Sequence, residues 1–211
     1  MVGGREQRND IAMQIAAREG KTIMFMRTKH GVDRQVKKLR RAGIHAQGLH
    51  GDKGQGARTR ALEGFASGET PVLVATDIAA RGIDVDDVSL VVHVDPPAEH
   101  KAYLHRAGRT ARAGTSGTVV TLVMDDQSKE VSQLLRKAGV DAPEVKVAPL
   151  SESLVTITGA RQPEGAPLPP PGQSQQPKRA TGSGNRKAGG NRSRGNNRAR
   201  RSDRSRRSNG R

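Results

Sequence analysis

Short apolar runs alternate with stretches of helical periodicity along the first two thirds of this chain. The apolar runs predict five strands, at Thr22–Met26, Ile44–Gln47, Val72–Ala75, Leu90–Val94 and Thr118–Val123. The periodic stretches predict five helices, at Asp10–Arg18, Val32–Ala42, Gln55–Ala66, Glu99–Ala107 and Ser128–Lys137. Helix stops are predicted at the glycines that follow four of them, Gly20, Gly43, Gly68 and Gly139.

The repeated alternation of strand and helix predicts an α/β fold, in which helices cover both faces of a parallel sheet. The runs at 72–75, 90–94 and 118–123 are apolar enough for burial on both faces. Ligand sites in such sheets gather at the carboxyl ends of the strands. The aromatic residues are Phe25, Phe65 and Tyr103, so the core is expected to be aliphatic.

The composition changes sharply toward the C-terminus. Residues 161–211 are dominated by Pro, Gly, Ser, Asn, Gln and Arg, and they carry 14 basic residues against two acidic ones. Such a segment buries too little apolar area to offset the entropy cost of ordering. We therefore predict a domain at 1–150 and a disordered basic tail at 151–211.

The net charge of +16 is concentrated in that tail and implies a polyanionic partner such as nucleic acid. No aromatic residue or amphipathic helix interrupts the tail, which argues against a membrane partner. The chain has no cysteine, no run approaching the ~20 apolar residues that cross a bilayer, and no signal-peptide pattern at its start. We expect a cytoplasmic protein.

One short segment holds a dense group of phosphate-binding side chains. His105, Arg106, Arg109 and Arg112 supply an imidazole and three guanidiniums within eight positions, around the small Gly108. The guanidinium fork matches phosphate oxygens, and the spacing of the last two arginines suits arginine fingers on one terminal phosphate. The alternative is a solvated basic face with no ligand.

Other polar segments follow predicted strands, where ligands collect. Directly after the strand at 72–75, Thr76 could bond a phosphate and Asp84 a sugar hydroxyl. The alternative is structural, with Asp77 capping the next helix and Gly82 permitting a turn. A second segment starts at His50 and places Arg58 and Arg60 near a helix start, where exposed amides favour anions, with Phe65 in the core. A third is the strand end at 25–29, which includes Thr28.

Taken in order, these segments resemble the second RecA-like domain of the DEAD-box RNA helicases, of the bacterial type, over residues 20–124. Met24–Lys29 resembles motif IV, His50–Arg58 the Q-x-x-R element, Ala75–Asp84 motif V, and His105–Arg112 motif VI. Histidine at 105, where related helicase families usually carry glutamine, favours this RNA-directed family. Ala107 and Ala111 replace commoner residues, and alanine is small enough for both places.

The resemblance implies a role for each matching residue. Arg109 and Arg112 reach the γ-phosphate of ATP, Asp84 contacts the ribose, and His105 and Arg106 couple this domain to its partner domain. An RNA path is implied along Thr28, Gln55, Arg58, Thr76, Arg81 and Gly82.

The sequence lacks the elements that bind ATP with Mg²⁺ in the first domain. Gly20-Lys21-Thr22 ends like a P-loop, but Ile15 stands where the first glycine is needed, and the triplet precedes a strand. There is no Asp-Glu-Ala-Asp stretch; Asp77, Asp95 and Asp125 follow apolar runs without the necessary glutamate. We expect no metal site here, and ATP with Mg²⁺ to be bound mainly by an N-terminal RecA-like domain outside this sequence.

Two functions remain open. The chain is the C-terminal half of an ATP-dependent RNA helicase, which supplies arginine fingers and part of the RNA surface and does not hydrolyse ATP by itself. Alternatively it is a non-enzymatic RNA-binding or annealing protein derived from a helicase fragment. Because Met1 stands just before the second domain, a fragment, a split-gene product and a truncated gene model are all compatible with the sequence.

Overall fold

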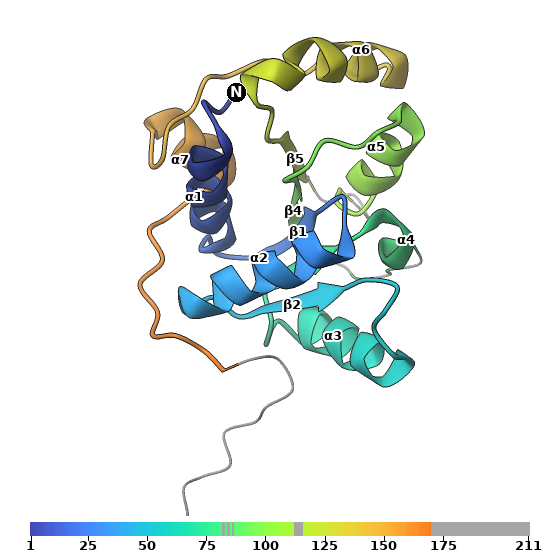
Figure 1. Ribbon diagram of the computed structural model, residues 1–211, viewed down its shortest axis with the longest axis vertical. Helices are drawn as coiled ribbons and strands as arrows, with labels where there is room; N and C mark the ends of the chain where they lie inside the picture. The colour runs from blue at the N-terminus through green and yellow to red at the C-terminus, as the bar shows by residue number, and fades with distance from the viewer. Residues whose placement is uncertain (82, 84, 86, 112–115, 170–211) are drawn as a thin grey trace, which may run out of the picture. The chain divides into compact units, whose positions relative to one another are not determined.

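Five parallel strands form one sheet in the order β2-β3-β1-β4-β5 (Figure 1). This computed structural model describes residues 1–169, apart from residues 82, 84, 86 and 112–115. The strands are β1 Lys21–Phe25, β2 Ala46–Leu49, β3 Val72–Ala75, β4 Val88–His93 and β5 Thr118–Thr121. The helices are α1 Arg5–Ala16, α2 Lys29–Arg41, α3 Gln55–Ser67, α4 Asp77–Ala80, α5 His100–Ala107, α6 Ser128–Ala138 and α7 Glu152–Thr158, and a 3-10 turn, η1, spans Asp125–Gln127. The predicted α/β fold with a parallel sheet is confirmed.

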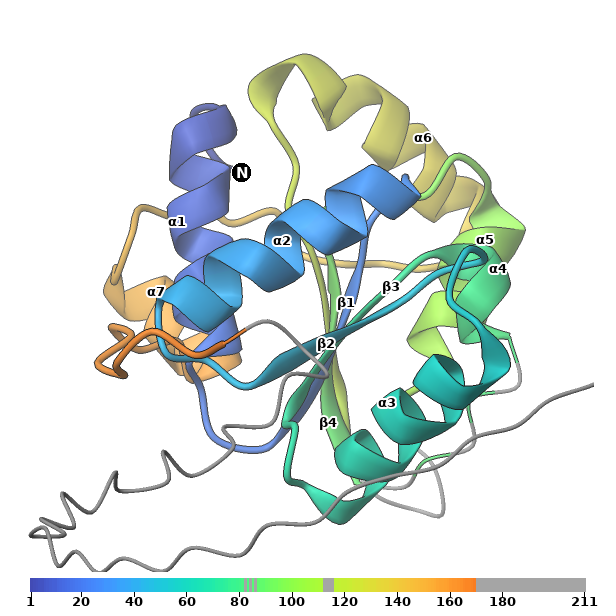
Figure 2. The same cartoon turned by 60° about the horizontal axis from the view of Figure 1, so that its bottom comes forward.

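Helices cover both faces of this sheet. Helices α1, α2 and α7 lie on one face, and α3, α4 and α5 lie on the other (Figures 1 and 2). Successive strand residues point to opposite faces, so neighbours in β1 enter different core clusters. Met24 packs with apolar residues of α1 and α2, whereas Phe25 packs with Phe65 of α3 and with the alanines of α4. The aliphatic strands thus hold two helical layers together.

The central strands are buried on both faces, as their apolar runs predict. Every residue of β3 is buried, and β4 is buried at all positions except Ser89. The expectation was wrong for 118–123, because β5 is an edge strand and its four residues are only half-buried. An apolar run alone does not tell an edge strand from a central one.

Most predicted elements are found within one to three residues of their expected ends, and the four predicted glycine stops all have positive φ. Gly68 and Gly139 are left-handed C-caps of α3 and α6, a conformation that costs glycine little. The largest displacement is the start of α1. Helix α1 begins five residues before Asp10, because its first turn is polar and pairs with the sheet edge, where Arg8 contacts Asp95 at 3.1 Å.

Strand β2 begins two residues later than predicted. Ile44 lies in the turn after α2 instead, and its N–H donates to the Leu39 carbonyl in the last turn of that helix at 3.0 Å. The parallel register pairs Ala46 with Val72 and Leu49 with Ala75. Local apolar character at Ile44 therefore serves the helix end and not the strand.

Residues just beyond the predicted boundary at 150 belong to the folded body. Helix α7 buries Leu154, which joins the core cluster of α1 and α2. The backbone N–H of Arg161 then donates to the Gln14 carbonyl at 3.0 Å, and that of Leu168 to the Arg40 carbonyl at 2.8 Å. The prediction of a tail from residue 151 rested on composition and missed one short amphipathic helix. None of the described helices is long and apolar enough to span a bilayer.

Replacing Leu154 tests whether α7 is part of the core. Leu154→Ala is expected to lower the free energy of unfolding by about 2–4 kcal/mol, because a buried leucine leaves a cavity. Val155→Ala, one residue along the same helix and 41% exposed, should change it by less than about 0.5 kcal/mol. Urea unfolding measures both values, and equal effects of the two substitutions would place α7 outside the core.

Candidate functional site

An ion pair joins α4 and α5 at the carboxyl edge of the sheet. Asp77 lies in the first turn of α4, and Arg106 lies near the end of α5. The guanidinium donates from Nε to Oδ1 at 2.5 Å and from Nη2 to Oδ2 at 2.8 Å. Its Nη1 also donates to the backbone carbonyl of Asp95, which follows β4, at 2.9 Å. Arg106 therefore ties α5 to the ends of both β3 and β4.

Aromatic rings surround this buried cation. Arg106 is 3% exposed, and its Cζ lies 5.0 Å from the centroid of the Phe25 ring. His93 packs edge-on between Phe25 and Tyr103, with centroid distances of 6.0 and 5.0 Å. Burial, reinforced by the charge of Arg106, lowers the pKa of His93 well below its usual range. A neutral histidine and a paired arginine thus share one small cluster.

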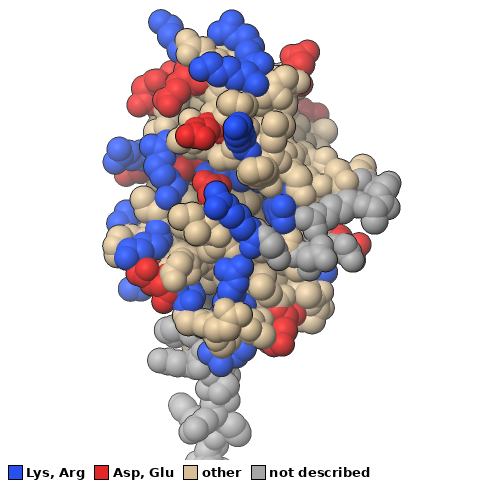
Figure 3. All heavy atoms as spheres, turned by 90° about the vertical axis from the view of Figure 1, so that its right-hand side faces the viewer, with Lys and Arg blue, Asp and Glu red and all other residues tan. Residues whose placement is uncertain are grey.

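A pocket of about 410 Å³ opens beside the ion pair, between α4 and α5. Its cationic lining consists of Arg81, Lys101, Arg106 and Arg109, with His105 exposed on the same helix. Arg109 donates from Nη1 to the Ile83 carbonyl at 2.7 Å and from Nε to the His105 carbonyl at 3.3 Å. Figure 3 faces the side of the molecule that carries α4 and α5, and basic side chains run down it with acidic ones among them. Arg106 neutralises Asp77, and the other carboxylate of the lining, Glu99, leaves the remaining cations in excess, so the pocket suits an anionic ligand.

A second group of the predicted residues lies along the starts of α3 and α4. Gln55 and Arg58 occupy the first turn of α3, and Arg58 Nη2 donates to the carbonyl of Arg81 at 3.3 Å. Thr76 is the N-cap residue of α4, and its N–H donates to the Leu49 carbonyl at 3.1 Å. These residues share the carboxyl edge with the pocket, which Arg81 also lines.

The loops after β1 and β2 are joined by charged side chains. Thr28 caps α2 by accepting from the Gly31 N–H at 3.0 Å, and its neighbour Lys29 contacts Asp52 at 2.6 Å. That ammonium holds the pKa of the Asp52 carboxyl below its usual range. Behind it, Asp33 accepts from Lys53 at 3.0 Å and lies 3.1 Å from His50. Lys29 and Asp52 therefore join the loop after β1 to the loop that leads into α3.

The structure describes most of the predicted site residues. It brings Arg81, His105, Arg106 and Arg109 around one pocket and places Arg58 against Arg81. Gly82, Asp84 and Arg112 lie outside the described residues. The described parts of the chain contain no group of three or more His, Cys, Asp or Glu side chains that could hold a metal ion.

Sequence reasoning missed the structural role of two carboxylates. Asp77 was weighed as a helix cap, but no side chain caps α4, and Asp77 pairs with Arg106 instead. Asp95 receives Arg8 on Oδ1 and the Arg27 N–H on Oδ2, at 3.1 and 3.0 Å. One available signal was the spacing of Tyr103 and Arg106, three apart on α5, which puts the arginine on the buried face.

Comparison with known proteins shows the family of this chain. The family described as "Helicase conserved C-terminal domain" matches residues 7–114, and the chain belongs to it. The ATP-dependent RNA helicase DBP2 of Debaryomyces hansenii is 42% identical over 128 residues, which is 59% of this chain and 24% of that protein. The chain spans about a quarter of the length of the curated relatives it matches. Those relatives are DEAD-box RNA helicases, as the sequence motifs predict.

Solved structures show the same fold. The C-terminal domain of the DEAD-box protein Dbp5 matches with a TM-score of 0.64 and 29% identity, over 73% of this chain and 90% of that one. Saccharomyces cerevisiae Dbp5 bound to RNA and ADP BeF3 matches with a TM-score of 0.66 and 29% identity, over 75% of this chain and 43% of that one. The fold is thus the RecA-like fold of C-terminal DEAD-box domains.

Arg106→Lys tests how far the ion pair stabilises the domain. A lysine carries the charge but cannot reach both Asp77 oxygens and the Asp95 carbonyl at once. We expect the free energy of unfolding to fall by about 2–4 kcal/mol, since hydrogen bonds to a buried charge are lost. The same substitution at the exposed Arg136 of α6 should leave it within about 0.5 kcal/mol. Equal stability of the two variants in urea would show that the fork is dispensable.

The buried neutral His93 predicts a pH dependence. Below about pH 6.5 the unfolded chain binds a proton at this position and the folded chain does not, so the free energy of unfolding decreases as the pH is lowered. Lowering the pH from 7 to 5.5 should reduce it by about 1 kcal/mol through His93. In urea titrations, His93→Gln should lose that part of the pH dependence, whereas His105→Gln on the exposed face of α5 should keep it. A wild-type slope in the His93 variant would mean that this imidazole titrates normally.

Proposed function

We propose that this chain acts as the nucleotide- and RNA-engaging second half of an ATP-dependent RNA helicase, with Arg109 as an arginine finger. The observation that carries the proposal is the pocket between α4 and α5, where Arg109, Arg81 and Lys101 lie around a carboxylate that Arg106 already neutralises. A triphosphate bound by an N-terminal RecA-like domain would meet these cations when the two domains close.

The side chains of this pocket fit a phosphoryl group. Arg109 reaches into the pocket from the end of α5, and its Nη1 is held at the Ile83 carbonyl. Turning this fork toward a γ-phosphate would place a fixed charge where negative charge develops during phosphoryl transfer. ATP with Mg²⁺ supplies the phosphoryl chemistry, and we propose that Arg112 and Asp84, outside the described residues, contact its phosphate and ribose. His105, exposed beside Arg109, is then available to contact the partner domain.

RNA is proposed to cross the starts of α3 and α4. Arg58 and Arg81 are in contact there, and Thr76 and Gln55 stand at the first turns of their helices, where exposed amides favour phosphates. Thr28 extends this line to the start of α2. The RNA surface and the phosphate pocket share Arg81, so domain closure and RNA contact would affect one another through the end of α4.

A second candidate function needs no partner domain. Residues 161–211 carry 14 basic residues against two acidic ones, which favours RNA binding or annealing by the chain alone. The folded body, which includes α7, would then serve as an RNA-binding domain, and the basic segment would raise the local RNA concentration.

Turnover in a fused protein tests the first function. The N-terminal part of a DEAD-box relative, joined ahead of this chain, should give RNA-stimulated ATP hydrolysis. Arg109→Lys and Arg109→Ala should each slow that turnover by about 10³-fold or more, because a point charge does not reproduce the guanidinium fork. Arg136→Ala on α6 is the matched control and should keep the rate. A large loss of nucleotide-free RNA affinity in the Arg109 variants would assign this residue to RNA instead.

Truncation after Pro169 tests the second function. It keeps the backbone hydrogen bonds at Arg161 and Leu168 and removes 13 of the basic residues. Single-stranded RNA affinity falls with log salt at a slope of about −0.7 for each phosphate neutralised, so the full chain should show a slope near −4 if about six arginines engage. The truncated chain should bind weakly, with a flatter slope and an unchanged melting temperature. Its residual binding should be reduced further by Arg58→Ala, and an unchanged salt slope after truncation would move the RNA anchor into the body.

A further inference from the structure

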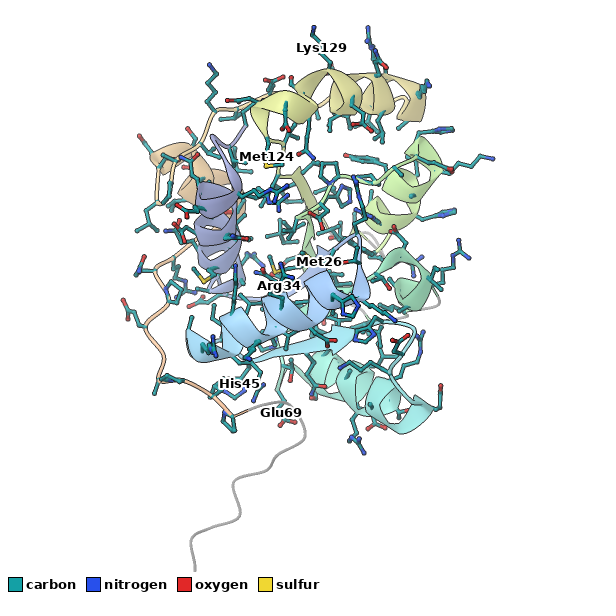
Figure 4. The ribbon with its side chains drawn as sticks, in the orientation of Figure 1. Met26, Arg34, His45, Glu69, Met124 and Lys129 are labelled. Carbon is teal, nitrogen blue, oxygen red and sulfur yellow. The ribbon has the colours of Figure 1, made fainter. Side chains whose placement is uncertain are left out.

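A second basic pocket lies on the opposite face of the sheet from α4 and α5. It has a volume of about 360 Å³ and opens between α1, α2 and the chain that follows β5. Figure 4 labels three of its lining residues: Met26 follows β1, Arg34 belongs to α2, and Met124 follows β5. The proposed ATP and RNA contacts do not use this pocket, apart from Thr28 at its rim.

Two helices direct their cations into it by helical spacing. On α2, Arg34 and Lys38 follow Gly31 at the third and seventh positions, so all three share one face. On α1, Arg5 and Arg8 are three residues apart and line the pocket from the other side. Arg27, at the end of β1, is the fifth cationic residue of the lining.

The single carboxylate in the lining does not balance these charges. Asp95 already accepts from Arg8 on Oδ1 and from the Arg27 N–H on Oδ2. Arg5, Arg34 and Lys38 form no ion pair within the described part of the chain. The pocket therefore presents a concentrated positive charge with both oxygens of its own carboxylate in use.

Buried donors beside the pocket also lack acceptors. Gln35 is 3% exposed and lines the pocket, and its Nε2 has no hydrogen-bond partner among the described residues. Arg8, which also lines the pocket, has a buried Nε without a hydrogen-bond partner among the described residues. Leaving a buried donor unpaired is costly, so such groups usually mark a missing acceptor. An acceptor that enters between α1 and α2 would satisfy both.

We propose that this pocket binds a phosphate dianion, either free phosphate or the terminal phosphate of an RNA. Forked guanidiniums recognise the several oxygens of a phosphate, and Gln35 and Arg8 add donors at the base of the pocket. A dianion balances more of the lining charge than an internal RNA phosphate or a carboxylate, which carries one charge. The site is separate from the proposed γ-phosphate contact, because the sheet lies between them.

Inorganic phosphate and NMR test the proposal on the full chain. Phosphate should be exchanged for chloride at constant ionic strength and pH, while the side-chain resonances of Gln35 Nε2 and Arg8 Nε are followed. Both should shift in a saturable way with a single dissociation constant. Phosphate bound elsewhere on the chain, including residues 170–211, would not move these two resonances together.

Substitutions on α2 provide a matched pair. The double variant Arg34→Gln with Lys38→Gln should weaken phosphate binding by about tenfold or more, since two charged contacts are lost. Lys37→Gln with Arg41→Gln removes the same charge, at the same spacing, from residues that line a different pocket, and should change the constant by less than about twofold. Gln35→Leu should also weaken binding while keeping the melting temperature, because no satisfied hydrogen bond is broken.

Two RNAs of one sequence, with a 5′-phosphate or a 5′-hydroxyl, identify the source of the ligand. If only the phosphorylated RNA shifts the Gln35 and Arg8 resonances, the site binds the terminal phosphate of an RNA. If inorganic phosphate shifts them and neither RNA does, the site binds free phosphate. Either result supports the site. Absence of saturable shifts with every phosphate, or equal weakening by the two double variants, would overturn it. Neither outcome bears on the helicase proposal, which is tested by turnover at Arg109.

Discussion

The ion pair between Asp77 and Arg106 sets the positions of the groups proposed to contact ligands. Asp77 begins α4, which is bounded by Thr76 and Arg81, and Arg106 lies in the last turn of α5, three residues before Arg109. A cation buried this deeply needs all of its partners, and it finds them on the ends of β3 and β4 and on the Phe25 ring. The relative positions of the proposed RNA contacts and the proposed arginine finger thus depend on one guanidinium.

Hydrophobic periodicity was sufficient to predict the order of elements and the parallel sheet, because burial on two faces leaves continuous apolar runs in β3 and β4. Periodicity did not predict the elements whose presence or ends depend on tertiary contacts. The polar first turn of α1 exists because Arg8 meets Asp95, far away in sequence, and α7 was hidden inside a polar, proline-containing region. Motif spacing located Arg109, Arg58 and Thr76 at the correct edge. It did not reveal that Arg106 is paired with Asp77, since a charge pattern does not record tertiary partners; only the three-residue spacing from Tyr103 indicates that Arg106 lies on the buried face of α5.

The arginines at the carboxyl edge of the sheet differ in burial and in the acceptors they contact. Arg106 is buried and paired with a carboxylate, whereas Arg109, which we propose as the arginine finger, is held by backbone carbonyls. The same distinction separates Arg8, engaged by Asp95, from Arg34 and Lys38 in the pocket on the far face. Arginine-rich motifs therefore need to be divided by burial and by the kind of acceptor before any one residue is assigned to a ligand.

The central claim is that this fold supplies phosphate contacts to a nucleotide which another domain must hold. ATP hydrolysis by the purified chain, measured with Mg²⁺ in the presence and absence of RNA, tests it most directly. We predict no RNA-stimulated rate above background, since the sequence has no P-loop and no Asp-Glu-Ala-Asp element to align the nucleotide. A Mg²⁺-dependent, RNA-stimulated rate that disappears with Arg109→Ala would contradict it, because the chain would then hold the nucleotide by itself.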